Sequence, residues 1–348
     1  MAPPPSQQLL PPILQNSHDD GSHAALLVLL LSFCMWELLY RVSGLFIQRV
    51  LSRYPHRLLD SSLRQPSVKN GTNGTTSNGG DNNGKQNGIH TTNNNTSSSS
   101  TATTAYETAQ RTLLYRGPSY LVSFLHSIYA TSRGCYHLYQ LWNASNLDKL
   151  LIPSSLHATT TLSTTMLTSY RPAHLSVAQT NTLFLSYLLY DLCHVLHQYP
   201  KLGGVDTILH HILFASCSLI NGTFGLMAFC FGWLVVGEGS TIFLNVRWYL
   251  LKSKRENGRW MQLVNGLFAI SFFITRIGIY SSGMIHLLYY SWDELLSLPQ
   301  VCGVPWSMLG LTCGCMMLGW VLNFVWGYKI LCMVVGGGKK KKRKPKNE

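Results

Sequence analysis

Ionisable side chains interrupt the long apolar runs of this 348-residue chain. Histidine can serve as a general base or a nucleophile near neutral pH, and a neighbouring carboxylate can orient its ring. The adjacent histidines His210 and His211 and the acidic residues Asp191 and Glu238 supply both kinds of group. We therefore predict these four residues as the candidate catalytic set.

Further polar residues lie in the same apolar runs. An ionisable group inside a membrane costs roughly 2.5 to 3.5 kcal/mol, so such groups usually face a cavity or one another. Counted at about 1.5 Å per residue, most of them reach the cytosolic half of the bilayer, and Arg133 and Arg276 lie deeper. We predict a cytosol-facing cavity with a cationic floor. Its predicted lipid-binding residues are His126, His194, Asn245, Arg247, Asn265, Arg276 and Arg133.

Two alternatives apply to these residues. Polar side chains in helix bundles can serve only to hydrogen-bond the helices together. A metal site is not expected, because adjacent histidines do not have the spacing of a chelating pair, and at most one of them should point straight into the cavity. On the first apolar run, Glu37 and Arg41 are four residues apart and should neutralise each other along one helix face.

The elements that must position these residues are about seven transmembrane helices, each a run of predominantly apolar residues. The predicted fold class is therefore an all-α polytopic membrane protein. The runs are 24–47, 119–142, 179–197, 207–221, 225–250, 261–290 and 304–335.

The distribution of positive charge fixes the predicted topology. The formal net charge is +13. If the amino terminus is luminal and the carboxyl terminus cytosolic, 21 of the 27 Lys and Arg residues fall in cytosolic segments, with Lys329 counted at the edge of the tail. This asymmetry satisfies the positive-inside rule, so nucleic acid is not needed to explain the charge and is not expected as a partner. No signal-peptide n-region precedes the first run, and we expect that helix to be uncleaved.

The chain divides into five predicted segments. Residues 66–105 are rich in Asn, Gly, Ser and Thr, so they should form a disordered insert. Lys344 and Lys346 lie five and three residues from the carboxyl end and resemble the KxKxx signal for retrieval to the endoplasmic reticulum, which coat proteins read. The segments are a luminal segment (1–23), a first transmembrane helix (24–47), a cytosolic linker with the insert (48–110), a membrane domain (111–335) and a basic cytosolic tail (336–348).

Four sequence motifs resemble those of the TLC domain, the family of the translocating-chain-associating membrane protein, the longevity-assurance ceramide synthases and several small TLC-domain proteins. The likeness covers roughly 110–335 and is greatest to the small proteins. The motifs are Leu121–His126 (LVSFLH), Tyr190-Asp191, Lys201–His211 with its double histidine, and Gly237-Glu238 through Asn245-Val246-Arg247-Trp248.

The resemblance implies a six-helix barrel in the membrane, preceded here by one extra helix. In ceramide synthases the double histidine lies in the site that transfers an acyl chain from acyl-CoA to a sphingoid base, and His210 and His211 match it. Those enzymes follow the histidines with a segment that holds two aspartates, whereas this chain has Glu238, Ser240 and Thr241 there.

We therefore expect an endoplasmic-reticulum protein that binds an acyl-chain lipid and acts in sphingolipid or phospholipid homeostasis. The first alternative is a ceramide-synthase-like N-acyltransferase with acyl-CoA as co-substrate, and the second is a factor in protein translocation or trafficking. No other cofactor is expected. The expected partners are membrane lipids and, through the terminal lysines, coat proteins, and the sequence leaves open whether the chain forms a homodimer.

Overall fold

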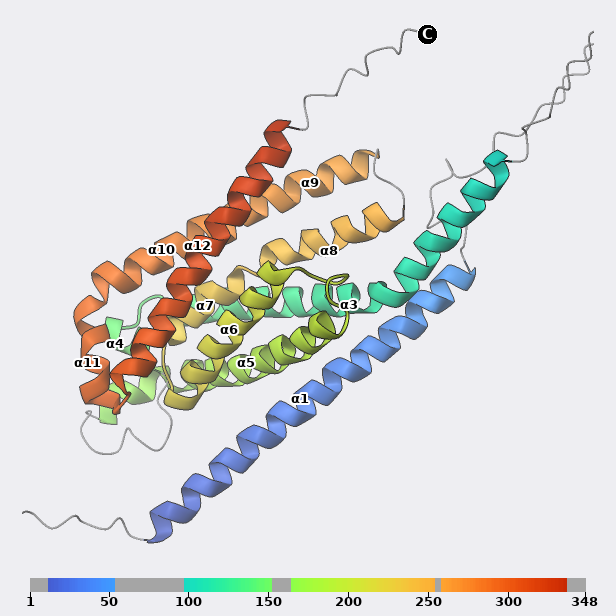
Figure 1. The fold of residues 1–348 in the computed structure, drawn as a ribbon. Coiled ribbons are helices and arrows are strands. Elements are labelled where there is room, and N and C mark those ends of the chain that lie inside the picture. Colours follow the sequence, from blue (N-terminus) through green and yellow to red (C-terminus); the bar gives the residue numbers. More distant parts are fainter. Residues whose placement is uncertain (1–11, 54–96, 152–163, 254–257, 337–348) are drawn as a thin grey trace, which may run out of the picture.

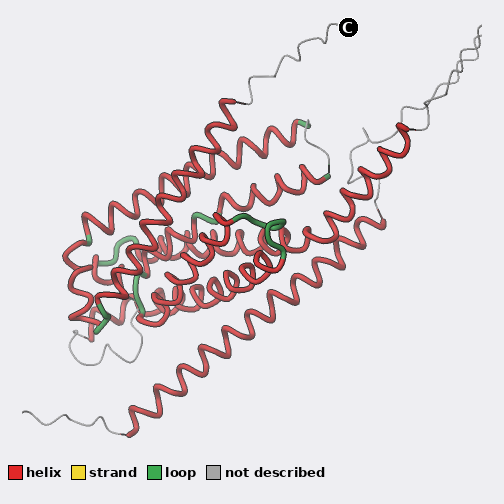
Figure 2. Tube along the Cα trace, viewed as in Figure 1, coloured by secondary structure: helices red, strands yellow, loops and turns green. Residues whose placement is uncertain are grey.

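The computed structural model describes residues 12–53, 97–151, 164–253 and 258–336, and these residues are almost entirely helical (Figures 1 and 2). Within them the one departure toward β structure is an isolated bridge between Leu151 and Leu226. The predicted all-α class is confirmed. The basic tail with Lys344 and Lys346 lies outside the described residues.

Each predicted apolar run coincides with a long helical stretch, although the helices extend further. The long stretches are α1 (Pro12–Arg53), α3 (Ser97–Leu141), α5 (Thr164–His197), α6 (Val205–Phe224), α7 (Ala228–Val236) with α8 (Gly239–Lys252), α9 (Arg259–Phe272) with η2 (Phe273–Ile279), α10 (Tyr280–Ile285) and η3 (His286–Tyr290), and α12 (Trp306–Gly336). Two shorter helices, α4 (Asn146–Leu150) and α11 (Trp292–Cys302), lie in the connections.

Four stretches within the described ranges are long and apolar enough to cross a membrane by length and composition, so the chain has the architecture of a polytopic membrane protein. α3, α5 and α6 carry more polar side chains, and the total of seven spans stays a prediction. The four stretches are Leu26–Arg53, Ala228–Lys252, Arg259–Tyr290 and Trp306–Val334.

Six of the helical stretches form a closed ring. α3 contacts α5, α5 contacts α6, α6 contacts α12, α12 contacts η2 and α9, α9 contacts α8, and α8 returns to α3. α1 contacts α3 and α5 and runs along the outside of the ring (Figure 1). This arrangement is the six-helix barrel with one additional helix that the sequence predicted.

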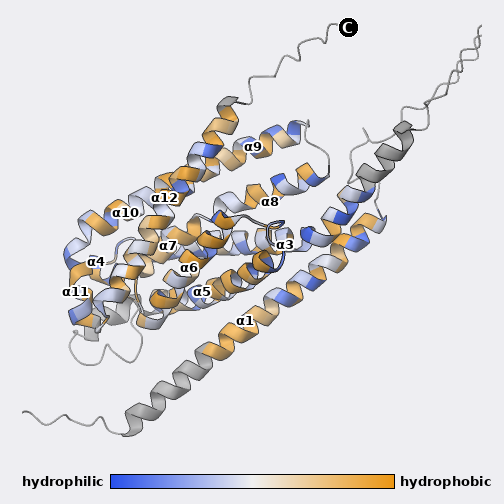
Figure 3. Ribbon diagram, in the orientation of Figure 1, coloured by the Kyte–Doolittle hydropathy of each residue, from blue (hydrophilic) through white to orange (hydrophobic). Residues whose placement is uncertain are grey.

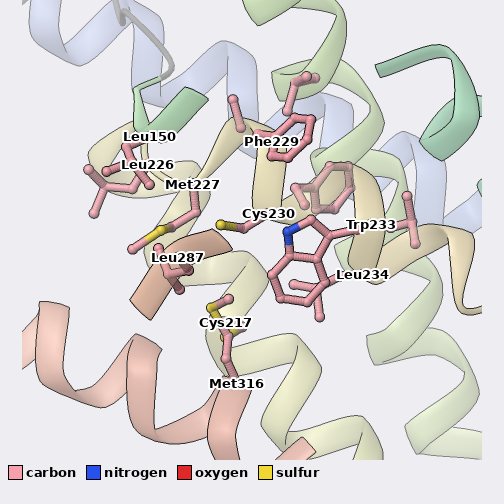
Figure 4. Close-up of a cluster of buried hydrophobic side chains, with 14 of the residues drawn as sticks. Leu150, Cys217, Leu226, Met227, Phe229, Cys230, Trp233, Leu234, Leu287 and Met316 are labelled. Carbon is pink, nitrogen blue, oxygen red and sulfur yellow. The ribbon is translucent and has the colours of Figure 1, made fainter. Parts of the chain in front are cut away.

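α7 fills the ring at one end. All nine of its residues are buried. Its side chains pack with residues of α4, α6, η3 and α12, as Figure 4 shows for Trp233, Leu150, Cys217, Leu287 and Met316. Many residues of α1 and α12 are apolar (Figure 3), and many of these side chains are exposed. This is expected for helices that face hydrocarbon. Among the described residues, α7 thus packs one end of the ring and leaves the opposite end free of it.

α3 begins earlier than the sequence predicted. Residues 97–105 belong to the segment for which we expected no ordered structure, yet they are helical and continue directly into the transmembrane part. Extending an existing helix costs much less than starting one, which explains the difference. The rest of the predicted insert lies outside the described residues. α3 also changes direction along its length (Figure 1) and contains Pro118, whose ring removes a helix hydrogen bond.

Close packing between α10 and α7 gives a test of the fold. A Cβ atom added at Gly283 would lie 2.4 Å from the Trp233 ring, whereas a Cβ atom at Gly266 in α9 would meet nothing within 4 Å. Gly283→Ala should therefore destabilise the protein by about 1 to 3 kcal/mol through overpacking. Gly266→Ala should be neutral or stabilise by up to about 1 kcal/mol. The midpoint of thermal unfolding in detergent, followed by size-exclusion chromatography, measures both, and equal midpoints for the two variants would contradict this packing.

Candidate functional site

A cavity of about 430 Å³ occupies the end of the ring that α7 leaves open. α3, α5, α6, α8, α9 with η2, and α12 all contribute to its wall. It lies where α5 ends, α6 begins and α8 ends, which is the end that the charge distribution assigns to the cytosol. Apolar side chains also line it, and these are Leu188, Val195, Leu202, Leu244, Phe268, Phe272, Ile330 and Met333.

The cavity brings together most of the residues that the sequence singled out. They come from five helical stretches that are far apart in the chain, and each contributes at least one polar group to the same space. The predicted residues that line the cavity are His126, Asp191, His210, His211, Glu238, Asn245, Arg247 and Arg276.

His211 is bonded at both ring nitrogens. Its Nε2 lies 2.8 Å from Oδ2 of Asp191, and its Nδ1 lies 2.8 Å from the backbone oxygen of Thr207. A carbonyl oxygen can only accept, so Nδ1 donates to Thr207 and Nε2 faces the carboxyl group. In this arrangement His211 has no free nitrogen for proton abstraction or nucleophilic attack, so the pair with Asp191 acts chiefly to join α6 to α5.

Glu238 is held by Arg276 rather than by a histidine. Nη2 of Arg276 lies 3.0 Å from Oε1 of Glu238 and 3.2 Å from Oγ1 of Thr241, and its Nε donates to Oγ of Ser240 at 3.1 Å. Arg276 is buried and also lies 5.9 Å from the centre of the Trp326 ring. Glu238 stands at the junction of α7 and α8, so this ion pair joins that junction to η2.

The other two histidines of the cavity have unoccupied ring nitrogens. His210 packs against Phe214 and Trp326, with ring centres 4.5 and 5.4 Å apart, and no hydrogen bond joins its ring to the described residues. His126 is 1 % exposed and stacks on Tyr187 with ring centres 3.5 Å apart, and neither nitrogen has a partner in the described part of the chain.

Both histidines of the pair line the cavity. Their rings are 5.5 Å apart and at 86° to each other. Adjacent residues of a helix point about 100° apart. His210 accordingly lies toward α12 and His211 toward α5, and the cavity extends to both.

Three predicted residues do not line the cavity. Arg133 donates to Thr180 and Ser176 of α5 at the depth that α7 fills, so the predicted cationic floor contains Arg276 without Arg133. His194 is rotated by about 60° from Asp191 on α5 and faces Glu37 of α1 at 3.4 Å.

Asn265 is the third residue outside the cavity. It accepts a hydrogen bond from Arg247 at 2.8 Å. Asn265 and Arg276 are eleven residues apart, which would place them on one face of a helix with 3.6 residues per turn. The π-helical turn of η2 places Arg276 in a wider coil, and the assumed spacing fails there. On α1 the predicted pair forms, with Arg41 Nε 2.9 Å from Glu37 Oε1.

Sequence reasoning missed several residues of the cavity. Asp206 accepts from Nε1 of Trp326 at 3.3 Å and lies 3.8 Å from Nζ of Lys329. All three line the cavity. Asp206 lay in the loop before the predicted run 207–221, and Lys329 fell near the end of the predicted run 304–335. Their positions at the cytosolic ends of two predicted spans were the only signal, and nothing in the sequence paired α6 with α12.

The buried ion pair of the cavity gives a test of its structural weight. Arg276→Met leaves the Glu238 carboxylate buried without its partner, which should destabilise the protein by about 3 to 5 kcal/mol. The double variant with Glu238→Gln should recover much of that loss. Arg41→Met removes the exposed pair with Glu37 and should cost less than about 1 kcal/mol. The free energy of unfolding in mixed detergent micelles measures all three, and a loss at Arg276 no greater than at Arg41 would contradict the pairing.

Comparison with known proteins agrees with this architecture. TLC domain-containing protein 4-B of Danio rerio is 30 % identical over 166 residues, which are 45 % of this chain and 59 % of the relative. TLC domain-containing protein 4-B of Xenopus laevis is 28 % identical over 152 residues, 42 % of this chain and 56 % of the relative. Thus the aligned part spans less than two thirds of either relative's length.

No solved structure matches the chain. The family match, described as the TLC domain, covers residues 118–332. This range begins at Pro118 inside α3 and ends within α12, so it contains the whole ring from that proline onward and leaves out α1. Both relatives are named as TLC domain-containing proteins and not as ceramide synthases, in agreement with the likeness that the sequence motifs indicated. The chain belongs to the TLC domain family.

Proposed function

We propose that this protein binds an acyl-chain lipid in the cavity of its helical ring and so acts in the lipid homeostasis of the endoplasmic-reticulum membrane. The observation that carries the proposal is the amphipathic cavity, which is lined both by apolar side chains and by polar groups from five helical stretches. Its volume of about 430 Å³ falls within the range of small-molecule sites in proteins, roughly 300 to 1,000 Å³.

The charges inside the cavity favour binding over a role in chemistry. Asp191 is paired with His211, and Glu238 is paired with Arg276. A general base or nucleophile needs a free lone pair, and a carboxylate that orients such a group must reach it. Glu238 bonds to neither histidine in the described structure, and His211 is bonded at both nitrogens. The arrangement resembles a pre-formed polar lining more than an activated dyad.

The cellular location is part of the same proposal. Lipids of the endoplasmic-reticulum membrane are the proposed ligands, and coat proteins that read Lys344 and Lys346 are the proposed means of retention. The rim of the cavity carries Arg247 and Lys329, the charge that the positive-inside rule assigns to the cytosolic side. A cytosol-facing opening would admit lipids from the cytosolic leaflet.

Cavity filling tests the binding function. Leu244→Trp should fill the space next to the apolar wall, whereas Leu263→Trp adds the same bulk to an exposed position of α9 that does not line the cavity. Cells fed a photoreactive, clickable fatty acid incorporate it into many lipids. After irradiation, we expect lipid crosslinked to the purified protein to fall at least about five-fold in Leu244→Trp and to stay at the wild-type level in Leu263→Trp. Equal crosslinking of all three proteins would refute a ligand in the cavity.

A second candidate function is acyl transfer from acyl-CoA to a sphingoid base, which is favoured by the free ring nitrogens of His210 in the cavity wall. Because His211 is bonded to Asp191 and Thr207, the base or nucleophile in this reading is His210. Microsomes without endogenous ceramide synthases, given sphingoid base and acyl-CoA, should then form N-acyl product with the wild type and His197→Ala and none with His210→Ala. Absence of product from the folded wild type would rule this reading out.

A further inference from the structure

We propose that the lipid held in this cavity presents an uncharged hydroxyl or amide group, and that His126 recognises it. This inference rests on the proposed binding function and names the class of its ligand. It begins from a buried side chain whose hydrogen-bonding capacity the fold leaves unused.

His126 lies on α3 in the wall of the cavity and is 1 % exposed. Neither of its ring nitrogens has a hydrogen-bond partner in the described part of the chain. Ser119 lies two turns earlier on the same helix and also lines the cavity, and its hydroxyl has no partner among the described residues either. A buried polar group without a partner costs about 1 to 3 kcal/mol. Two such groups in one cavity wall are explained if a ligand supplies their partners.

The ring of His126 is held in place without hydrogen bonds. It stacks on Tyr187 at an interplanar angle of 10°, and the Trp36 ring of α1 meets it edge-on with ring centres 5.6 Å apart. Trp36 is itself fixed by a bond from its Nε1 to Oγ of Ser186 at 3.0 Å. The aromatic contacts orient the imidazole plane, and both buried ring nitrogens are left without a partner in the described part of the chain.

The chemistry of the ring selects the ligand group. No carboxylate pairs with His126 among the described residues, and a neutral imidazole offers one N–H donor and one nitrogen acceptor. A hydroxyl or an amide also donates and accepts, so it can satisfy the ring. A phosphate diester only accepts and an ammonium group only donates, and either would satisfy at most one nitrogen.

The pairing of the other charges in the cavity also favours an uncharged ligand group. The deep ionic groups of the cavity are paired with one another, as Asp191 is with His211 and Glu238 with Arg276. A charged head group at this depth would have to displace one partner and leave a buried charge uncompensated, which is costly. The remaining cations of the cavity are Arg247, which donates to Asn265, and Lys329, whose side chain is 60 % exposed and lies 3.8 Å from Asp206.

Photolabelling of the purified full-length protein in nanodiscs tests the inference. The probes are photoreactive monoacylglycerol, a long-chain alkyl phosphate and a long-chain amine, each with a hydrocarbon chain of the same length. We expect saturable labelling that favours monoacylglycerol by at least about tenfold over the other two. His126→Phe keeps the aromatic stacking and removes the nitrogens, so it should lower monoacylglycerol labelling about tenfold. His137→Phe, the same change three turns further along α3 and outside the cavity lining, should leave it unchanged.

Three results decide between the proposals. The expected preference together with loss in His126→Phe supports both. Saturable labelling that favours the alkyl phosphate or the amine overturns the ligand class while the binding function stands. This result comes from the wild type alone, so it holds whether or not the variants fold. Absence of saturable labelling by any probe overturns the binding function itself. The thermal midpoint of His126→Phe should equal or exceed that of the wild type, because the lost nitrogens make no bond within the described protein.

Discussion

The ion pair between Arg276 and Glu238 is the interaction on which the organisation of the cavity depends. It joins η2 to the junction of α7 and α8, where the helix that fills one end of the ring gives way to the helix that lines the other. In a hydrocarbon environment neither charge can be left alone, and the pair also draws in the hydroxyls of Ser240 and Thr241. The boundary between packed core and open cavity therefore lies at this pair.

Much of the fold could be predicted from the sequence because the membrane imposes a simple pattern. Apolar runs of sufficient length indicated helices, and the ionisable residues within these runs indicated where the helices meet. Glu238, Asp191 and His211 were found in this way, since a buried charge must have a reason to be there. The helix ends and the additional helical turns before the transmembrane part of α3 were not found, because local composition argued for disorder at residues 97–105.

The errors at the site have a common physical cause. Helix-face arguments fix which residues share a side of one helix, but they do not say which neighbour that side meets. Arg133 shares a face with His126, yet α7 fills the ring at its depth, and His194 is turned toward α1. The contacts of Asp206 with Trp326 and Lys329 depend on α6 lying beside α12, which no local pattern encodes. Asn265 was misplaced because a π-helical turn cannot be read from a 3.6-residue period.

The same π-helical turn limits how this chain can vary in length. A π-helix holds one more residue per turn than the α-helix around it, so it stores an extra residue inside α9 and its continuation. Because a π turn and an α turn both complete one revolution, removing one residue from Phe273–Ile279 would restore the α-helical period and leave the helix beyond it facing nearly as before. Elsewhere in the same helix a single-residue deletion would rotate all the residues beyond it by about 100°. A change of length by one residue is therefore best tolerated within this stretch, provided that Arg276 itself is kept.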